Sequence, residues 1–164
     1  MSRLFAISGF LVLTATAALA QSSGTKKFIT EAIEGNYAEV QMGELAQKNG
    51  QSDGVKSLGK MLIDDHGQAN KKAIDTAKSM NVTGPNGPNA KQKSDYDKMA
   101  RMNGPAFDKS FAQHMVNDHK KDIAAYKKQS KSKDASGEYA QETLPTLQMH
   151  LDEAQKLQRQ SSKR

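Results

Sequence analysis

The chain has 164 residues, a formal net charge of +6 and no cysteine. This length fits one domain of ordinary size with a sufficient hydrophobic core. The lack of cysteine excludes disulfides and thiolate chemistry, so packing alone must hold the fold. The lysines between residues 127 and 133 lie where a helix should end, a position that favours cations, and we therefore expect no nucleic-acid partner.

The first twenty residues have the pattern of a secretory signal peptide. Arg3 supplies a positive charge, residues 4–19 form an apolar run without charge, and Ala18-Leu19-Ala20 is a small-x-small cleavage signature. A membrane anchor would need a longer apolar span with charged flanks, whereas a polar segment follows here. We expect residues 1–20 to be removed and residues 21–164 to form a single periplasmic or secreted domain without an integral membrane segment.

The rest of the chain has the apolar periodicity of helices separated by turn signals. Apolar residues recur at three- and four-residue steps, and no stretch shows the alternation typical of strands. The predicted long helices span residues 27–48, 53–80 and 105–130, and a last one begins after the N-cap residue Asp134 and continues through Leu157. A Gly/Pro cluster at 83–88 opens a long connector, which we expect to carry a short helix over 91–102.

Four amphipathic helices of similar length, joined by two tight turns and one long connector, predict an all-α protein with a four-helix bundle. Leu62, Phe107 and Phe111 are expected in its core. Pro145 lies inside the last helix and should bend it, because proline removes one backbone hydrogen bond.

Three histidines and one glutamate fall on the apolar stripes of four different helices. His66, His119 and His150 each lie three or four residues from a core residue of the same helix, so they should point inward. Glu39 lies at the edge of the stripe of the first helix, among small residues that leave room around it. The fourth histidine, His114, is at the margin of its helix and is the least favoured ligand.

The same four side chains are level along the bundle. Glu39 and His66 are equally far from the first turn, and His119 and His150 are equally far from the second. Both levels lie roughly 20–23 Å from the turns at 1.5 Å per residue, near the middle of helices of this length. Converging imidazoles and a carboxylate favour a transition metal such as iron, zinc or copper over magnesium or calcium.

Asp65 and Asp118 each precede one of these histidines. They are candidates for further metal ligands or for acceptors that orient the imidazole rings. The alternative to a metal site is a hydrogen-bonded polar layer that fixes the register of the helices. A single buried histidine would favour that alternative, whereas three histidines level with a carboxylate favour the metal.

Several short motifs resemble bacterial proteins grouped as domain of unknown function 4142. The matching pieces are Phe28, Glu39-Val40, Asp65-His66, Phe107-Asp108, His119 and Leu144-Pro145 followed by His150-Leu151. The resemblance spans about residues 27–158 and implies an exported, ferritin-like four-helix protein. Within it, Glu39, His66, His119 and His150 match a recurrent polar core.

Ferritin-like di-iron sites place Glu-x-x-His on two helices, and this chain departs from that pattern. Ile63, Val116 and Leu147 stand three places before the three histidines. An imidazole-rich centre is therefore more natural than a di-iron oxidase.

Three classes of function remain open from the sequence. The favoured one is an exported metal-binding protein in metal handling or envelope stress. The others are a metal-free structural or stress-protective bundle and a metal-dependent oxidoreductase. No nucleophile triad, phosphate-binding glycine loop or dinucleotide fingerprint is present, so no organic cofactor is expected and no catalytic residue is assigned.

Overall fold

The computed structural model describes residues 12–161, with side chains described from residue 23 onward. Over this range the chain forms helices and no strand, as the sequence predicted. None of the described helices is long and apolar enough to span a membrane. The helices are α1 (Val12–Asn49), α2 (Asp53–Ser79), α3 (Ala90–Met99), α4 (Gly104–Gln129) and α5 (Ala135–Ser161).

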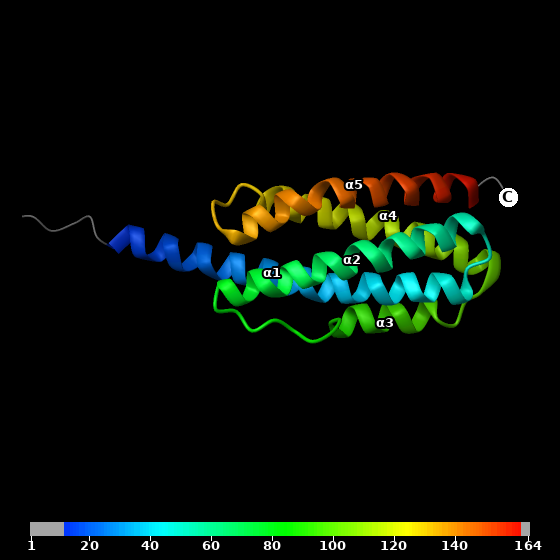
Figure 1. The fold of residues 1–164 in the computed structure, drawn as a ribbon, viewed down its shortest axis with the longest axis horizontal. Helices are drawn as coiled ribbons and strands as arrows, with labels where there is room; N and C mark the ends of the chain where they lie inside the picture. Colours follow the sequence, from blue (N-terminus) through cyan, green and yellow to red (C-terminus); the bar gives the residue numbers. More distant parts are fainter. Residues whose placement is uncertain (1–11, 162–164) are drawn as a thin grey trace, which may run out of the picture.

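The long helices pack as two hairpins laid side by side (Figure 1). α1 packs against α2, α4 packs against α5, and the hairpins meet through α2 with α5 and α1 with α4. The short helix α3 contacts α1 and α4 and so covers the seam between them. Polar side chains that point inward from α1, α2, α4 and α5 therefore share one interior.

The first helix begins earlier than predicted. The prediction started at residue 27, where the amphipathic repeat starts, but α1 is continuous from Val12. Residues 12–26 are rich in alanine and contain no proline, and such a segment needs no amphipathic face to be helical. Residues 1–11 of the predicted signal peptide lie outside the described range.

α1 and α2 approach each other closely at a pair of glycines. A Cβ atom on Gly43 would lie 2.5 Å from the carbonyl oxygen of Gly59, and a Cβ on Gly59 would lie 2.7 Å from the Cβ of Ala46. These contacts exclude any side chain, so glycine is required for this helix spacing. The crossing lies one turn from Glu39 and fixes the height of α2 along α1.

Carboxylates anchor the two tight turns. Asp108 near the start of α4 accepts hydrogen bonds from the backbone N–H groups of Gln51 and Ser52, both at 2.9 Å. Asp134, the predicted N-cap of α5, accepts from the N–H groups of Ser136 at 3.0 Å and Gly137 at 3.1 Å. Both turns are thus held by side chains that satisfy backbone N–H groups at or just before the start of a helix.

Helix α3 is shorter than the predicted range of 91–102. Asn89 forms a capping box with Gln92 at its start, and the Asn89 amide donates to Glu34 of α1 at 3.0 Å. At its end, the Asn49 amide donates to the carbonyl oxygens of Ala100 at 3.3 Å and Met102 at 2.8 Å. α3 is therefore fastened to α1 at both ends.

The predicted core residues are inside the bundle. Leu62, Phe107 and Phe111 are fully buried, and the two phenyl rings stack with centroids 5.6 Å apart. α5 continues through Pro145 from Ala135 to Ser161. The bend expected at Pro145 stays a prediction.

Replacing Leu62 by alanine should lower the free energy of unfolding by roughly 2–5 kcal/mol, because it leaves a cavity in a fully packed interior. Urea denaturation of Leu62→Ala measures this loss. The exposed Gln68 on the same helix provides the control, since Gln68→Ala should change stability by less than about 0.5 kcal/mol. A loss that small for Leu62→Ala would contradict the packing described here.

Candidate metal centre

Three histidines from three helices meet in the interior. His66 comes from α2, His119 from α4 and His150 from α5, and their exposed fractions are 4%, 0% and 0%. One nitrogen of each ring lies within 4.8 Å of the other two, a group that could hold a metal ion. The ring centroids are 5.2–5.7 Å apart. The helix faces and heights inferred from the sequence therefore do bring these three side chains together.

The tautomer of His119 is set by its own helix. Its Nδ1 lies 3.0 Å from the carbonyl oxygen of Met115, one turn earlier in α4. A carbonyl can only accept, so Nδ1 carries the hydrogen and donates it. Nε2 is left with a lone pair that points toward His150.

His150 is oriented from across the bundle. Its Nε2 lies 2.8 Å from Asp65 Oδ2, which joins α5 to α2. The carboxylate accepts, so Nε2 carries the hydrogen and Nδ1 keeps a lone pair. Asp65 was predicted as a ligand or an orienting acceptor, and it lies in the second of these positions.

His66 is oriented by a residue that the sequence analysis did not single out. Its Nδ1 donates to Asn36 Oδ1 at 2.9 Å, and the Asn36 amide donates in turn to the hydroxyl of Tyr139 at 3.0 Å. The amide oxygen faces the ring and can only accept, so Nδ1 of His66 carries the hydrogen. Asn36 is buried on the apolar stripe of α1, and a buried amide among apolar residues was the signal available in the sequence.

The N–H group of each ring therefore donates to an outer partner, and the lone pair of its other nitrogen points inward. His119 Nε2 and His150 Nδ1 face each other at 3.3 Å, and His66 Nε2 has no hydrogen-bond partner among the described residues. Two facing lone pairs repel unless a proton or a metal ion lies between them. Burial and the neighbouring His150 lower the pKa of His119 to about 3, which disfavours the proton.

The 3.3 Å between His119 Nε2 and His150 Nδ1 also suits a metal ion. Ligand nitrogens at 2.0–2.1 Å from a tetrahedral ion are separated by about 3.3 Å. Burial lowers the pKa of both His66 and His150, so all three rings stay neutral, the form that binds metals. Three nitrogen donors of this kind suit zinc, iron or copper.

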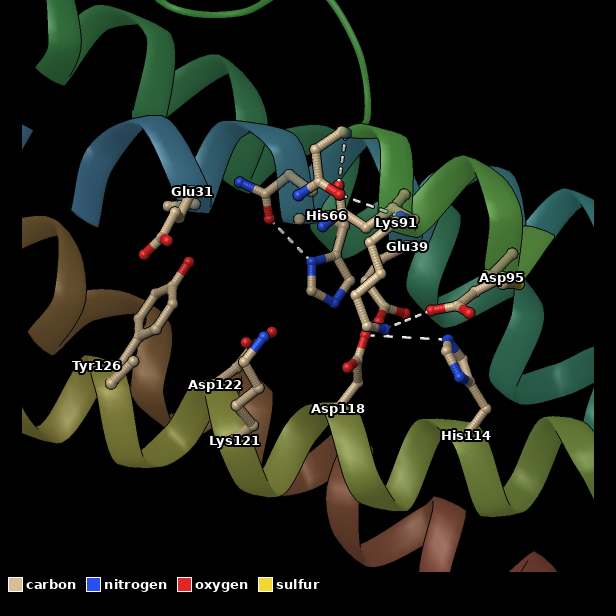
Figure 2. Close-up of a pocket in the computed structure, with 18 of the residues that line it drawn as sticks. Glu31, Glu39, His66, Lys91, Asp95, His114, Asp118, Lys121, Asp122 and Tyr126 are labelled. Carbon is tan, nitrogen blue, oxygen red and sulfur yellow. Dashed lines mark hydrogen bonds and ion pairs between the residues drawn. The ribbon is translucent and has the colours of Figure 1, made fainter. Parts of the chain in front are cut away.

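Glu39 and Asp118 border a neighbouring pocket and are not members of the histidine group. Glu39 is buried at 3% exposure, and its Oε2 has no hydrogen-bond partner among the described residues. Burial, together with the charges of Asp118 and Asp122, raises the pKa of Glu39 well above its usual value. Figure 2 shows Glu39, Asp118 and His66 around this pocket, with His114 beside Asp118.

A family model for a domain of unknown function, DUF4142, matches residues 11–157. The comparisons with curated proteins and with solved structures found no match. The family match covers most of the chain, including every residue of the histidine group. The protein therefore belongs to the DUF4142 family.

Proposed function

We propose that the protein is an exported metal-binding protein whose centre is formed by His66, His119 and His150, and that it handles a transition metal in the cell envelope. The observation that carries this proposal is the facing of His119 Nε2 and His150 Nδ1 at 3.3 Å, with no donor hydrogen left for the space between them. A metal ion is the group that two neutral imidazole lone pairs can share.

A metal-free polar layer accounts less well for the same contacts. Such a layer is stable when its members donate to one another, because buried polar groups need partners. Here the donors are already used by Met115, Asp65 and Asn36, so the inward side has acceptors alone. The outer partners resemble those that orient metal-binding histidines in general.

We propose that the bundle has the ferritin-like arrangement. Its support is the packing of two hairpins joined by one long connection, as in bundles of that class. The donor set differs from a di-iron carboxylate site, since three imidazoles replace most of the carboxylates. Binding and transfer of one ion suit it better than oxygen chemistry.

Protein purified from its own host without an affinity tag should contain about one transition-metal ion per chain, by analogy with sites of three or four protein ligands. Elemental analysis gives the metal and its amount. His119→Ala should lose the ion, and His119→Gln, which keeps a polar side chain of similar size, should lose it too. Asn117→Ala, on the exposed side of the same helix, is the control. Metal-free wild-type protein, or unchanged metal in both His119 variants, would contradict the proposal.

The metal-free protein should lose stability as the pH falls below about 6.5, the ordinary histidine pKa. The unfolded chain takes up a proton at His119 near that pH, whereas the folded protein does so only near pH 3 because the pKa is lowered to about 3. His119 therefore does not change the free energy of unfolding with pH above about 6.5. Thermal melts at pH 7 and pH 4.5 should show a larger fall for wild type than for His119→Gln, and bound zinc should raise the melting temperature at pH 7. Equal pH dependence in the two proteins would be the contrary result.

Export is expected to remove residues 1–20. The periplasmic or secreted protein should start at Gln21, because the small residues Ala18 and Ala20 flank a cleavage position that follows an apolar run. Intact mass spectrometry of the protein from its native host measures this directly. Ala18→Glu should block the cleavage and serves as the comparison. A native mass that retains Met1 to Ala20 would rule the signal peptide out.

A further inference from the structure

A polar pocket of about 150 Å³ lies between α1 and α4, under α3 (Figure 2). α2 contributes His66 to its lining, while α1, α3 and α4 contribute carboxylates. These carboxylates are Glu31, Glu39, Asp95, Asp118 and Asp122. The pocket has room for several water molecules, and so for a cation with part of its hydration shell.

The pocket is rich in carboxyl groups, although the chain as a whole is basic. Five carboxylates face Lys91 and Lys121, whereas the whole chain carries a formal charge of +6. Lys91 is paired with Asp95 at the outer part of the pocket. Burial, followed by the charge of Asp118, raises the pKa of Asp122 to about 7, so this carboxyl group holds its proton more tightly than an exposed one. Carboxyl groups that gather around one pocket supply the oxygen ligands that divalent cations prefer.

Two buried polar atoms of the pocket lining point to a ligand. Glu39 Oε2 and His66 Nε2 have no hydrogen-bond partner among the described residues, although both side chains are more than nine-tenths buried. Burial and the charges of Asp118 and Asp122 raise the pKa of Glu39, so its carboxyl group keeps a proton until a cation replaces it. A cation beside Glu39 would take the place of that proton, and the lone pair of His66 is the next ligand inward.

His66 connects this pocket with the histidine group. It lines the pocket, whereas His119 and His150 do not, and its ring centroid is 5.7 Å from that of His119 and 5.2 Å from that of His150. An ion that reaches His66 is therefore next to both remaining ligands. The two other rings have no exposed surface of their own.

From this arrangement we infer that the pocket under α3 is a docking site for a hydrated divalent cation, and that Glu39 passes the cation to His66. The passing step rests on the proposed metal centre, whereas docking rests on the pocket alone. Glu39 and Asp118 replace water ligands of the incoming ion, and the lone pair of His66 then replaces Glu39. Glu39 releases its proton to water when it binds the ion, and no other bond within the protein forms or breaks in this exchange.

Stopped-flow loading with zinc, followed by a chromophoric chelator, tests the passing step. Glu39→Gln should load about ten-fold more slowly than wild type, since an amide cannot release a proton to become a carboxylate ligand and loss of one supporting group at a metal site has effects of this order. Glu44→Gln makes the same change at an exposed position of α1 outside the pocket and should match wild type.

Three results would overturn the route. Equal loading rates for Glu39→Gln and Glu44→Gln would show that the ion arrives elsewhere. Less zinc bound at saturation, with an unchanged rate, would make Glu39 a resident ligand. If wild type loads no zinc at all, the proposed metal centre and the passing step fail together, and docking is judged by the next experiment.

Manganese broadening of backbone NMR signals tests docking without the histidine group. In wild type and in His119→Gln, low concentrations of Mn²⁺ should broaden the signals of Glu39, Asp118 and Asp122 first. The double variant Glu39→Gln with Asp118→Asn should lose this preference. Exposed acidic residues such as Glu138 serve as internal controls. Equal broadening at Glu138 and in the pocket would overturn the docking site, whatever the zinc experiment gives.

Discussion

The interior of this bundle depends on three hydrogen bonds that turn imidazole N–H groups outward. Met115 holds His119 within one helix, Asp65 holds His150 from α2, and Asn36 holds His66 from α1. Because buried donors must be satisfied, the bonds of Asp65 and Asn36 restrict how α5 and α1 are placed against α2, while the bond of Met115 orients the His119 ring on its own helix. The same bonds leave three acceptor nitrogens on the inner side, so the fold and the candidate site are set by one network.

Helical periodicity predicted which histidines are buried, because that property depends on the position of each residue along its own helix. It did not predict the role of Asn36 or the separate position of Glu39. Asn36 lies one turn before Glu39 on α1 and takes the hydrogen of His66, while Glu39 faces the pocket beside α4. Which of two inward residues contacts a given ring depends on how the neighbouring helices are rotated about their axes. A single sequence does not directly show that rotation.

The helix boundaries show the same limit. The starts of α2, α4 and α5 were predicted within one residue because turn and capping residues mark them locally. The end of α3 was missed because Asn49, which is distant in sequence, binds the carbonyl groups that follow the helix. The start of α1 was missed because an alanine-rich segment can be helical without an apolar stripe.

Two opposite pKa shifts lie next to each other in this structure. Burial lowers the pKa of His66 and His119, and burial with neighbouring carboxylates raises the pKa of Glu39. In both cases the folded protein disfavours charge on the side chain, since each group lacks a partner of opposite charge. A divalent cation supplies that partner to the carboxylate and accepts the lone pairs of the imidazoles. The proposed ion would therefore relieve first the cost at Glu39 and then the cost at the histidines, and its binding would be coupled to the stability of the whole bundle.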